Sequence, residues 1–454
     1  MIDKLFTIIP PWLIILLVIF NVMLGAAAYL ILLERKVASW VQDRIGPNRV
    51  GPKGLLQPLA DGLKMFTKED FRSSNTDGTM FTLAPILMIL VVFTAMALIP
   101  WGGIYQGTLT YISSNASALD IPSGATLVAG PIATGNPNEY NLTYRFPVQI
   151  ADMNIGVLYI IAVLAMVVYS VVLGAWASNN KFSFLGGMRA AAQMISYEVP
   201  LGLSIITIVL MFGTLSLSEI TTAQAGYWVG FIPAWNIFCQ PLAFVMFLIC
   251  IHAEANRAPF DLAEAEQELV GGYHTEYTSM RLGLLLMGEY IEMVVTSAVL
   301  VALFLGGWHF PGLTGTVDPT NPAVSTSILE IALRVSVYFA KITTVIGVFM
   351  WVRWTLPRFR YDQLMNVAWR GMVPISLCLM LGTALIVYAN HTEVVPGQRL
   401  TVTGSQALMF LAMNVALLVL IAIAAMFVPR ITANKKMAIP GSRFASELPA
   451  VTPD

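Results

Sequence analysis

Long apolar runs alternate with short polar segments along most of this chain, and nine of the runs are long enough to cross a membrane. About 20 helical residues span the hydrocarbon core of a bilayer. The pattern predicts an all-α polytopic membrane protein, with residues 1–428 as a single membrane domain. Its nine expected spanning helices lie near residues 12–33, 80–100, 155–175, 198–216, 236–252, 282–306, 328–353, 371–389 and 406–428.

The polar segments predict how these helices are oriented. Cytoplasmic loops of membrane proteins carry an excess of Lys and Arg. Here 20 of the 25 Lys and Arg residues fall after helices 1, 3, 5 and 7 or in the C-terminal tail. The N-terminus is therefore expected outside and the C-terminus in the cytoplasm, where the polar residues 429–454 form a flexible tail.

The first cytoplasmic loop, residues 34–79, contains an expected amphipathic helix. Leu56, Leu59, Leu63 and Phe66 recur at helical spacing, which is typical of a helix that lies in the membrane interface. Such a helix is either a surface anchor packed on the bundle or one wall of an entrance for a lipid-soluble ligand. The two alternatives remain open from the sequence.

An insertion on the opposite side of the membrane, residues 101–150, is rich in Gly, Ser, Thr and Asn. Its runs GTLTYIS and EYNLTYRFPV are expected to pair as short strands outside the cytoplasm. No catalytic pattern is visible in this segment.

The amino-acid composition excludes several classes of function. A hydrophobic content of 57% excludes a soluble globular protein, and a net charge of −1 gives no basic stripe for nucleic acid. The three cysteines form no CxxC motif, and the four histidines lack the spacing of metal ligands. We therefore predict no metal or cofactor bound by this chain, and no catalytic residue of its own.

Negative charge gathers in one segment, HAEANRAPFDLAEAEQELVGGYHTEY, residues 252–277. A carboxylate at the centre of a membrane helix costs about 2.5 to 3.5 kcal/mol, so this segment is expected in a cytoplasmic loop, 253–281, facing water or another protein. A short helix is predicted, with Asp261 as N-cap and Glu264 at the third position. The segment contains one cation, Arg257, and six carboxylates: Glu254, Asp261, Glu264, Glu266, Glu268 and Glu276.

Helix capping explains some of these carboxylates but not all. On such a helix Asp261, Glu264 and Glu268 form one acidic stripe, and Glu264 and Glu268 repel each other. A solvated face is one interpretation. The other is a functional cluster, because like charges in a poorly solvated site raise carboxyl pKa values and make their protons mobile near neutral pH. We favour the second.

Further ionisable residues fall inside the expected helices. Glu198 begins helix 4, Glu289 and Glu292 share one face of helix 6, and Lys341 lies within helix 7 at overlapping depth. Ionisable residues in a membrane usually face the bundle interior and mark proton or ion pathways. Static ion pairs are the alternative. Together with Glu276, these residues predict a proton path. Their overlapping depths also make ion pairs between helices feasible.

Five segments of the chain follow one another in a recognisable order: ERKVASWVQDRIGPNRVGPKGLLQPLADGLKMFTKED, ADMNIGVLY, AQMISYEVPLGLS, EANRAPFDLAEAEQELVGGYHTEY and LPRFRYDQLM. They resemble the signature sequences of one membrane-subunit family, the H subunits of respiratory NADH-quinone oxidoreductase, complex I. The resemblance covers roughly residues 10–390.

The resemblance implies a subunit that joins the redox arm to the proton-pumping arm of complex I in a bacterial inner membrane. Quinone would be the substrate, and FMN and iron–sulfur clusters would lie in partner subunits. Antiporter-like membrane subunits would be further partners, along with membrane lipid. The family places these residues at the quinone chamber: Glu34, Arg35, Glu254, Arg257, Asp261, Glu264, Glu266 and Glu268.

The same resemblance implies that Glu198 and Glu289 begin a hydrophilic path along the membrane arm. Three features depart from the family pattern: the insertion before ADMNIG, the ninth helix with its tail, and Gln267 where Ser is common. Two alternative functions stay open, the membrane subunit of an energy-converting hydrogenase and an independent ion-coupled transporter.

Overall fold

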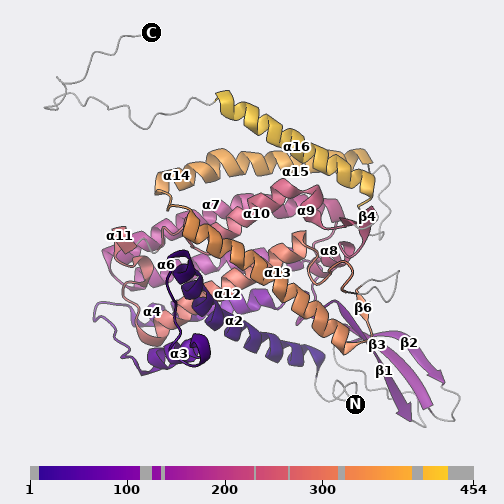
Figure 1. Ribbon diagram of the computed structural model, residues 1–454, viewed down its shortest axis with the longest axis horizontal. Helices are drawn as coiled ribbons and strands as arrows, with labels where there is room; N and C mark the ends of the chain where they lie inside the picture. The colour runs from indigo at the N-terminus through magenta and orange to yellow at the C-terminus, as the bar shows by residue number, and fades with distance from the viewer. Residues whose placement is uncertain are drawn as a thin grey trace. The chain divides into compact units, whose positions relative to one another are not determined.

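The computed structural model describes residues 10–112, 125–133, 139–229, 232–263, 266–314, 323–390 and 402–427 (Figure 1). The chain divides into two compact units, Met1–Asn414 and Val415–Asp454. All sites discussed below belong to the first unit.

Helices long and apolar enough to span a membrane dominate the described residues, which confirms the predicted fold class. Eight such segments are present, and two of them are built from consecutive helices. They are α2 (Pro11–Val41), α4 (Gly78–Met96), α5 (Gly156–Ala165) with α6 (Val167–Ala177), α7 (Lys181–Phe212), α12 (Ser279–Phe304), α13 (Ile328–Thr355), α14 (Tyr361–Asn366) with a π-helical turn (Val367–Met372) and α15 (Val373–Asn390), and α16 (Gly404–Phe427).

The fifth predicted span differs from the others, because it is broken. The four-residue α9 (Asn236–Cys239) is followed at once by α10 (Pro241–Glu254), which has 14 residues. Asn414 of α16 lies against the break: its amide donates to the Cys239 carbonyl at 3.2 Å, and its oxygen accepts from Leu242 N–H at 3.2 Å. Backbone groups freed inside a membrane protein need such partners. The ninth predicted helix therefore supplies a residue that completes the fifth.

Two helix boundaries predicted from hydropathy were wrong in ways that matter for function. Helix α2 continues to Val41, so Glu34 and Arg35 lie on a helix and not in the following loop. Helix α7 begins at Lys181 after an Asn180 cap, so Glu198 sits in its middle and does not open it. The polar first half of α7 is helical because it packs against protein, which a hydropathy window does not register.

The predicted strand pairing outside the bundle is confirmed. Strand β1 (Ile104–Ile112) pairs antiparallel with β3 (Glu139–Pro147), and β2 (Thr126–Ala133) and β6 (Val324–Ser325) complete a sheet of order β2-β3-β1-β6. A second, two-stranded sheet joins β4 (Tyr227–Val229) to β5 (Ile232–Pro233).

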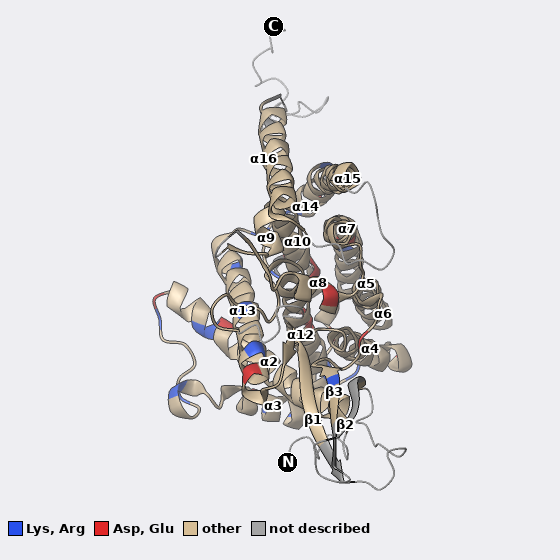
Figure 2. Ribbon diagram, turned by 90° about the vertical axis from the view of Figure 1, so that its right-hand side faces the viewer, with Lys and Arg blue, Asp and Glu red and all other residues tan. Residues whose placement is uncertain are grey.

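Helix α12 forms the core of the first unit. In its most apolar 18-residue window, 83% of residues are buried, against 22% for α2. It packs against α2, α4, α10 and α13. A carboxylate on α12 is therefore surrounded by protein on every side. Figure 2 shows how few charged residues interrupt these helices.

The predicted amphipathic helix is α3 (Gln57–Thr67). Leu59, Leu63 and Phe66 are 63%, 60% and 70% exposed. An exposed apolar face on a short helix suits the membrane interface, where lipid covers it. The other short helices are α8 (Leu217–Ala223), α11 (Glu266–Leu269) and the 3₁₀ turns Pro52–Gly54 and Gly272–His274.

Candidate functional site: two cavities joined by buried charge

The acidic segment folds back onto α7 after α10 ends at Glu254. The Gln193 amide of α7 donates to the carbonyls of Ala253 and Phe260, each at 2.7 Å, and so fixes the turn between them. Further along, Gly186 lies so close to the segment that a Cβ there would be 2.8 Å from the Gly272 Cα. Helix α7 therefore holds the acidic segment at two points, one of which requires glycine.

The predicted capping helix at Asp261 was wrong. Residues 261–263 form no helix, and α11 begins only at Glu266. Asp261 is instead buried, and the Arg358 guanidinium donates to it at 2.5 Å. An arginine distant in sequence thus replaces the helix terminus as the partner of this carboxylate. Asp261 therefore does not lie on one helix with Glu268. Glu264 lies outside the described residues, as does the side chain of Glu266.

The carboxylates of this segment meet different environments. Glu254 is buried, contrary to the expectation that all would face water or a partner. Glu268 is 63% exposed and accepts from Arg189 at 2.7 Å, and Glu276 accepts from the Asn180 amide at 2.7 Å. An exposed ion pair such as Arg189–Glu268 contributes about 0 to 1 kcal/mol. The buried carboxylates therefore have the stronger electrostatic interactions.

Arg257 lies between two buried carboxylates from different helices. Its guanidinium is 3.5 Å from the Glu289 carboxylate of α12 and 4.0 Å from the Glu34 carboxylate of α2. It also lies 4.2 Å from the centre of the Tyr290 ring, a cation–π contact. One cation thus links the acidic segment to both helices.

Both of these carboxylates accept further hydrogen bonds. Glu34 accepts from the Tyr290 hydroxyl at 2.5 Å and from Arg353 of α13. Glu289 accepts from the Tyr273 hydroxyl at 2.5 Å. Charged hydrogen bonds of this kind offset the cost of burying the carboxylates.

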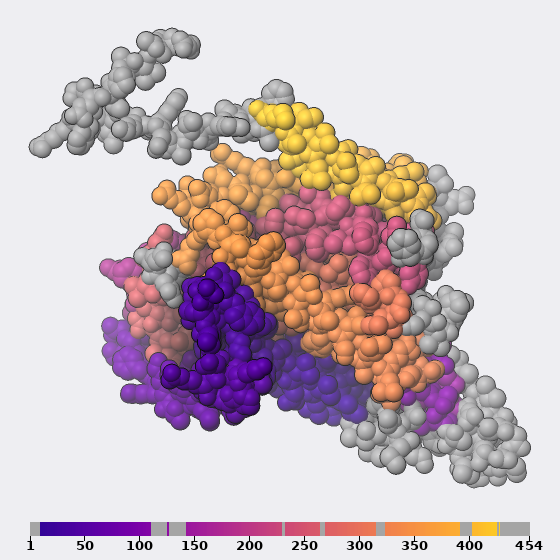
Figure 3. All heavy atoms as spheres, viewed as in Figure 1, coloured from indigo at the N-terminus to yellow at the C-terminus, as the bar shows by residue number. Residues whose placement is uncertain are grey.

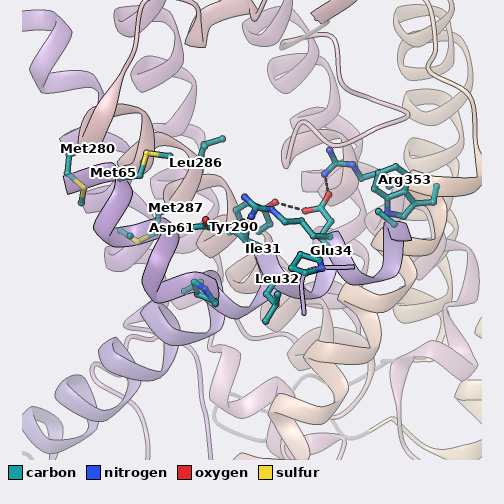
Figure 4. Close-up of a pocket in the computed structure, with 18 of the residues that line it drawn as sticks. Ile31, Leu32, Glu34, Asp61, Met65, Met280, Leu286, Met287, Tyr290 and Arg353 are labelled. Carbon is teal, nitrogen blue, oxygen red and sulfur yellow. Dashed lines mark hydrogen bonds and ion pairs between the residues drawn. The ribbon is translucent and has the colours of Figure 1, made fainter. Parts of the chain in front are cut away.

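Glu34 also lines a cavity of about 610 Å³ between α2, α3 and α12, which we call the large cavity. In Figure 4, methionines gather at one end and Glu34 with Arg353 at the other. A cavity that is apolar at one end and charged at the other suits an amphiphile with a long tail and a polar head. Its other lining side chains include Ile31, Leu32, Arg35, Ala38, Asp61, Met65, Met280, Leu286, Met287 and Tyr290.

Arg35, predicted at the chamber entrance, lies on the rim of the large cavity. Its guanidinium donates to Asp61 of α3 at 2.8 Å, and the Asp61 side chain also accepts from Gln57 at 3.0 Å. This contact ties α2 to the amphipathic helix. Helix α3 therefore forms one wall of the large cavity, which favours the second of the two roles proposed for it.

Glu198 and Glu254 face a second cavity deeper in the bundle, of about 20 Å³, which we call the small cavity. Its other lining residues are apolar apart from Thr296, and among the described residues no Lys or Arg lines it. A space of this size holds one water molecule when polar groups surround it. Two carboxyl groups thus share a water-sized cavity.

Glu292 follows Glu289 by three residues on α12, and both are buried. Residues three apart on a helix are neighbours on one face. One oxygen of Glu292 and one of Glu254 have no hydrogen-bond partner among the described residues. The structure therefore brings together Glu34, Arg257, Glu289, Glu292, Glu254 and Glu198 within one region of the bundle.

Lys341 lies apart from this group. Its ammonium donates to the carbonyls of Leu305, Gly307 and His309 at 2.6, 2.9 and 2.6 Å, beyond the far end of α12. The described residues show no pairing of Lys341 with a carboxylate. Burial, with the charges of Lys341 and Arg334, lowers the pKa of the nearby His309 to about 4.

Sequence reasoning missed several residues that complete the site. Arg353 and Arg358 were counted only among the positive charges that orient the helices, although Arg358 falls within the motif LPRFRYDQLM. Tyr273 and Gln193 also fall within quoted motifs, whereas Tyr290 lies outside all five. Their roles arise from contacts across more than one element, which local spacing does not encode.

Comparison with known proteins shows the family of this chain. A family model described as NADH dehydrogenase matches residues 13–384. The chain belongs to this family. Two similar relatives are the NADH-quinone oxidoreductase H subunit of Flavobacterium johnsoniae, 43% identical over 82% of this chain and 94% of its own, and the first such H subunit of Cytophaga hutchinsonii, 44% identical over 83% and 96%.

Another relative, the first NADH-quinone oxidoreductase H subunit of Geobacter metallireducens, is 42% identical over 81% of this chain and 94% of its own. These matches confirm the family resemblance seen in the sequence. The chain is accordingly a membrane subunit of an NADH-quinone oxidoreductase.

Proposed function

We propose that this chain walls part of the quinone-binding chamber of complex I and couples quinone reduction to proton translocation. The observation that carries the proposal is the continuity from the large cavity, through Arg257, to the buried carboxylates of α12 and α10. The partners would be the peripheral subunits that hold FMN and iron–sulfur clusters and the antiporter-like membrane subunits. The proposed location is a bacterial inner membrane, with the N-terminus outside.

The large cavity would admit the quinone. Its volume falls within the range of about 300 to 1,000 Å³ typical of small-molecule sites. The methionines of the apolar end offer flexible, polarisable contacts to an isoprenoid tail. Helix α3, with its lipid-facing apolar side, would form the wall past which the tail enters from the bilayer.

Quinone reduction takes up two electrons and two protons, so the quinol is as neutral as the quinone. Charge in the chamber would change because protons drawn from groups of the chamber leave each donor one unit more negative. Electrons would come from a cluster in a partner subunit. Arg257, held between Glu34 and Glu289, would respond to that change because its attraction to each carboxylate depends on the charge near the other. Loss or gain of negative charge at Glu34 would thus be felt at Glu289, within the membrane.

From Glu289 the effect would pass along α12 to Glu292 and then to Glu254 and Glu198 at the small cavity. Carboxyl groups in a dry site cannot all be ionised, so neighbours share protons and titrate together. A water molecule in the small cavity would carry a proton between Glu254 and Glu198. This sequence of groups is the proposed start of the proton path.

Other residues of the acidic segment would act at the rim. Asp261, Glu264, Glu266 and Glu268 would complete the chamber wall toward partner subunits, with Arg358 holding Asp261 in place. Glu276 lies just before α12 and Lys341 just beyond its other end, so we assign them to the two ends of the path, without contact to the central carboxylates.

The test compares Glu254→Gln and Glu292→Gln in the fully assembled complex. Each change keeps the side-chain shape but removes a proton-carrying group. We expect normal NADH oxidation with a water-soluble acceptor, but loss of proton pumping that depends on quinone. Glu69→Gln, on an exposed residue of the first loop, is the matched control. Normal pumping per quinone reduced in both variants would overturn the coupling proposal.

A further inference from the structure

A second apolar groove lies on the opposite side of α2 from the large cavity. It measures about 400 Å³ and runs between α2, α12 and α13, with Leu55 of the first loop at one end. Apart from Tyr29, Thr343 and Lys36, its lining side chains are apolar. Figure 3 shows the first loop lying against α13 on this face. The quinone proposal makes no use of this groove.

One end of the groove carries a positive charge at the depth of a lipid headgroup. Lys36 lines the groove and also an adjacent polar hollow of about 400 Å³, whose lining includes Arg44 and Lys53. Trp40, one helical turn after Lys36, is 65% exposed and marks the interface depth that tryptophan prefers. Asp43 is the acidic residue of the hollow and leaves cations in excess.

Lys36 retains capacity for a ligand. Its ammonium donates one hydrogen bond, to the Lys53 carbonyl at 2.7 Å, among the described residues. An ammonium has three donors, so two remain to face the hollow. The hydrogen bond from Lys36 to Lys53 also holds the first loop at the end of the groove. The Lys36 ammonium therefore lies beside the apolar channel.

We propose that this groove holds an acyl chain of an anionic phospholipid whose phosphate binds Lys36. Charge complementarity selects this occupant. Basic residues that lie between membrane helices on the cytoplasmic side attract anionic headgroups, and the apolar channel that starts at Lys36 takes the chain. A zwitterionic lipid would gain the apolar contact but less from the excess of cations, and a quinone tail would gain nothing from Lys36.

The experiment uses the intact complex in vesicles that contain one of two photoreactive probes. The probes are phosphatidylglycerol and phosphatidylcholine with the same diazirine-bearing acyl chain, and labelled peptides are mapped by mass spectrometry. We expect phosphatidylglycerol to label the groove segments of α2 and α13 about fivefold more than phosphatidylcholine does. Lys36→Gln should abolish this preference, and Lys64→Gln, an exposed cation of α3 outside the groove, should keep it.

A second pair of variants tests the channel independently of Lys36. Thr343 is exposed and lines the groove, whereas its neighbour Thr344 is exposed and does not. Thr343→Trp should block the acyl chain and remove labelling by both probes, and Thr344→Trp should leave labelling as in the wild type. Equal labelling by the two lipids in the wild type, or displacement of the label by excess long-tailed quinone, would overturn the proposal.

Discussion

The large and small cavities both present carboxyl groups, but they hold them in opposite ways. In the large cavity, Glu34 accepts from Tyr290 and Arg353 and faces Arg257. In the small cavity, Glu254 and Glu198 share a space of about 20 Å³ whose lining includes no cation among the described residues. The first arrangement fixes a charge in place. The second leaves protonation as the way to relieve repulsion.

The difference suggests a division of labour along one chain. A carboxylate held by Tyr290 and Arg353 beside the large cavity suits binding and sensing of a ligand, because its position is fixed and a change of its charge acts directly on Arg257. The two carboxyl groups of the small cavity, which no Lys or Arg lines among the described residues, suit proton transfer because their charge is the quantity that changes. Arg257 links Glu34 of the large cavity to Glu289, which precedes Glu292 by three residues on α12.

The largest effect is expected where the two regions join. Arg257→Gln would leave Glu34 and Glu289 buried without their shared cation, and breaking a buried ion pair costs about 3 to 5 kcal/mol. We expect poor assembly of the subunit or, where it assembles, loss of quinone reductase activity. Yield of assembled complex and quinone reduction per complex measure this.

The control for that change is Arg189→Gln, which removes an exposed pair with Glu268 that is worth about 1 kcal/mol at most. Assembly should stay near the wild-type level. If Arg257→Gln assembled and reduced quinone as well as Arg189→Gln did, the junction assigned to Arg257 would be wrong.

The contact between α7 and the acidic segment should be the next most sensitive feature. Gly186→Val places methyl groups against Gly272 and the Tyr273 backbone, and overpacking of this kind costs about 1 to 3 kcal/mol. We expect a lower unfolding temperature in detergent and faster proteolysis after Arg257. Gly202→Val, on the same helix with open space at its Cβ, is the control and should change neither.

Filling the large cavity should affect substrate binding more than turnover. A Cβ on Gly283 points at Met65 and Met280 of the cavity wall. Gly283→Leu should raise the KM for quinone roughly tenfold, the equivalent of about 1.4 kcal/mol, with a smaller change in kcat. Gly347→Leu, at a glycine with open space at its Cβ and outside the cavity, should keep the wild-type KM. Equal KM values for the two variants would argue against quinone in this cavity.

The smallest effect concerns acid stability far from both cavities. The pKa of His309 is lowered to about 4, below the ordinary value of 6.5, so the folded state resists a proton that the unfolded state accepts. This contribution to stability is present above pH 6.5 and is lost as the pH falls toward 4. His309→Phe should flatten the fall in unfolding temperature over that window; an unchanged slope would contradict it.

The fold class, one strand pairing, the amphipathic helix and the family could all be predicted from the sequence alone. Apolar runs of spanning length fixed the fold class, because a bilayer core requires them. The runs GTLTYIS and EYNLTYRFPV predicted the pairing of β1 with β3, and the spacing of Leu59, Leu63 and Phe66 predicted α3. The five motifs, which occur in the same order as in the family, also predicted the family. Each of these signals is local, so it survives without knowledge of the rest of the fold.

The tertiary structure decided which charges meet. Asp261 looked like a helix cap but pairs with Arg358, nearly 100 residues away. Glu254 looked exposed but is buried beside Glu198, and Lys341 looked available to the carboxylates but binds carbonyls beyond α12. The reason is physical: the state of a buried charge depends on the partners and cavities that packing brings to it, and those come from distant parts of the chain.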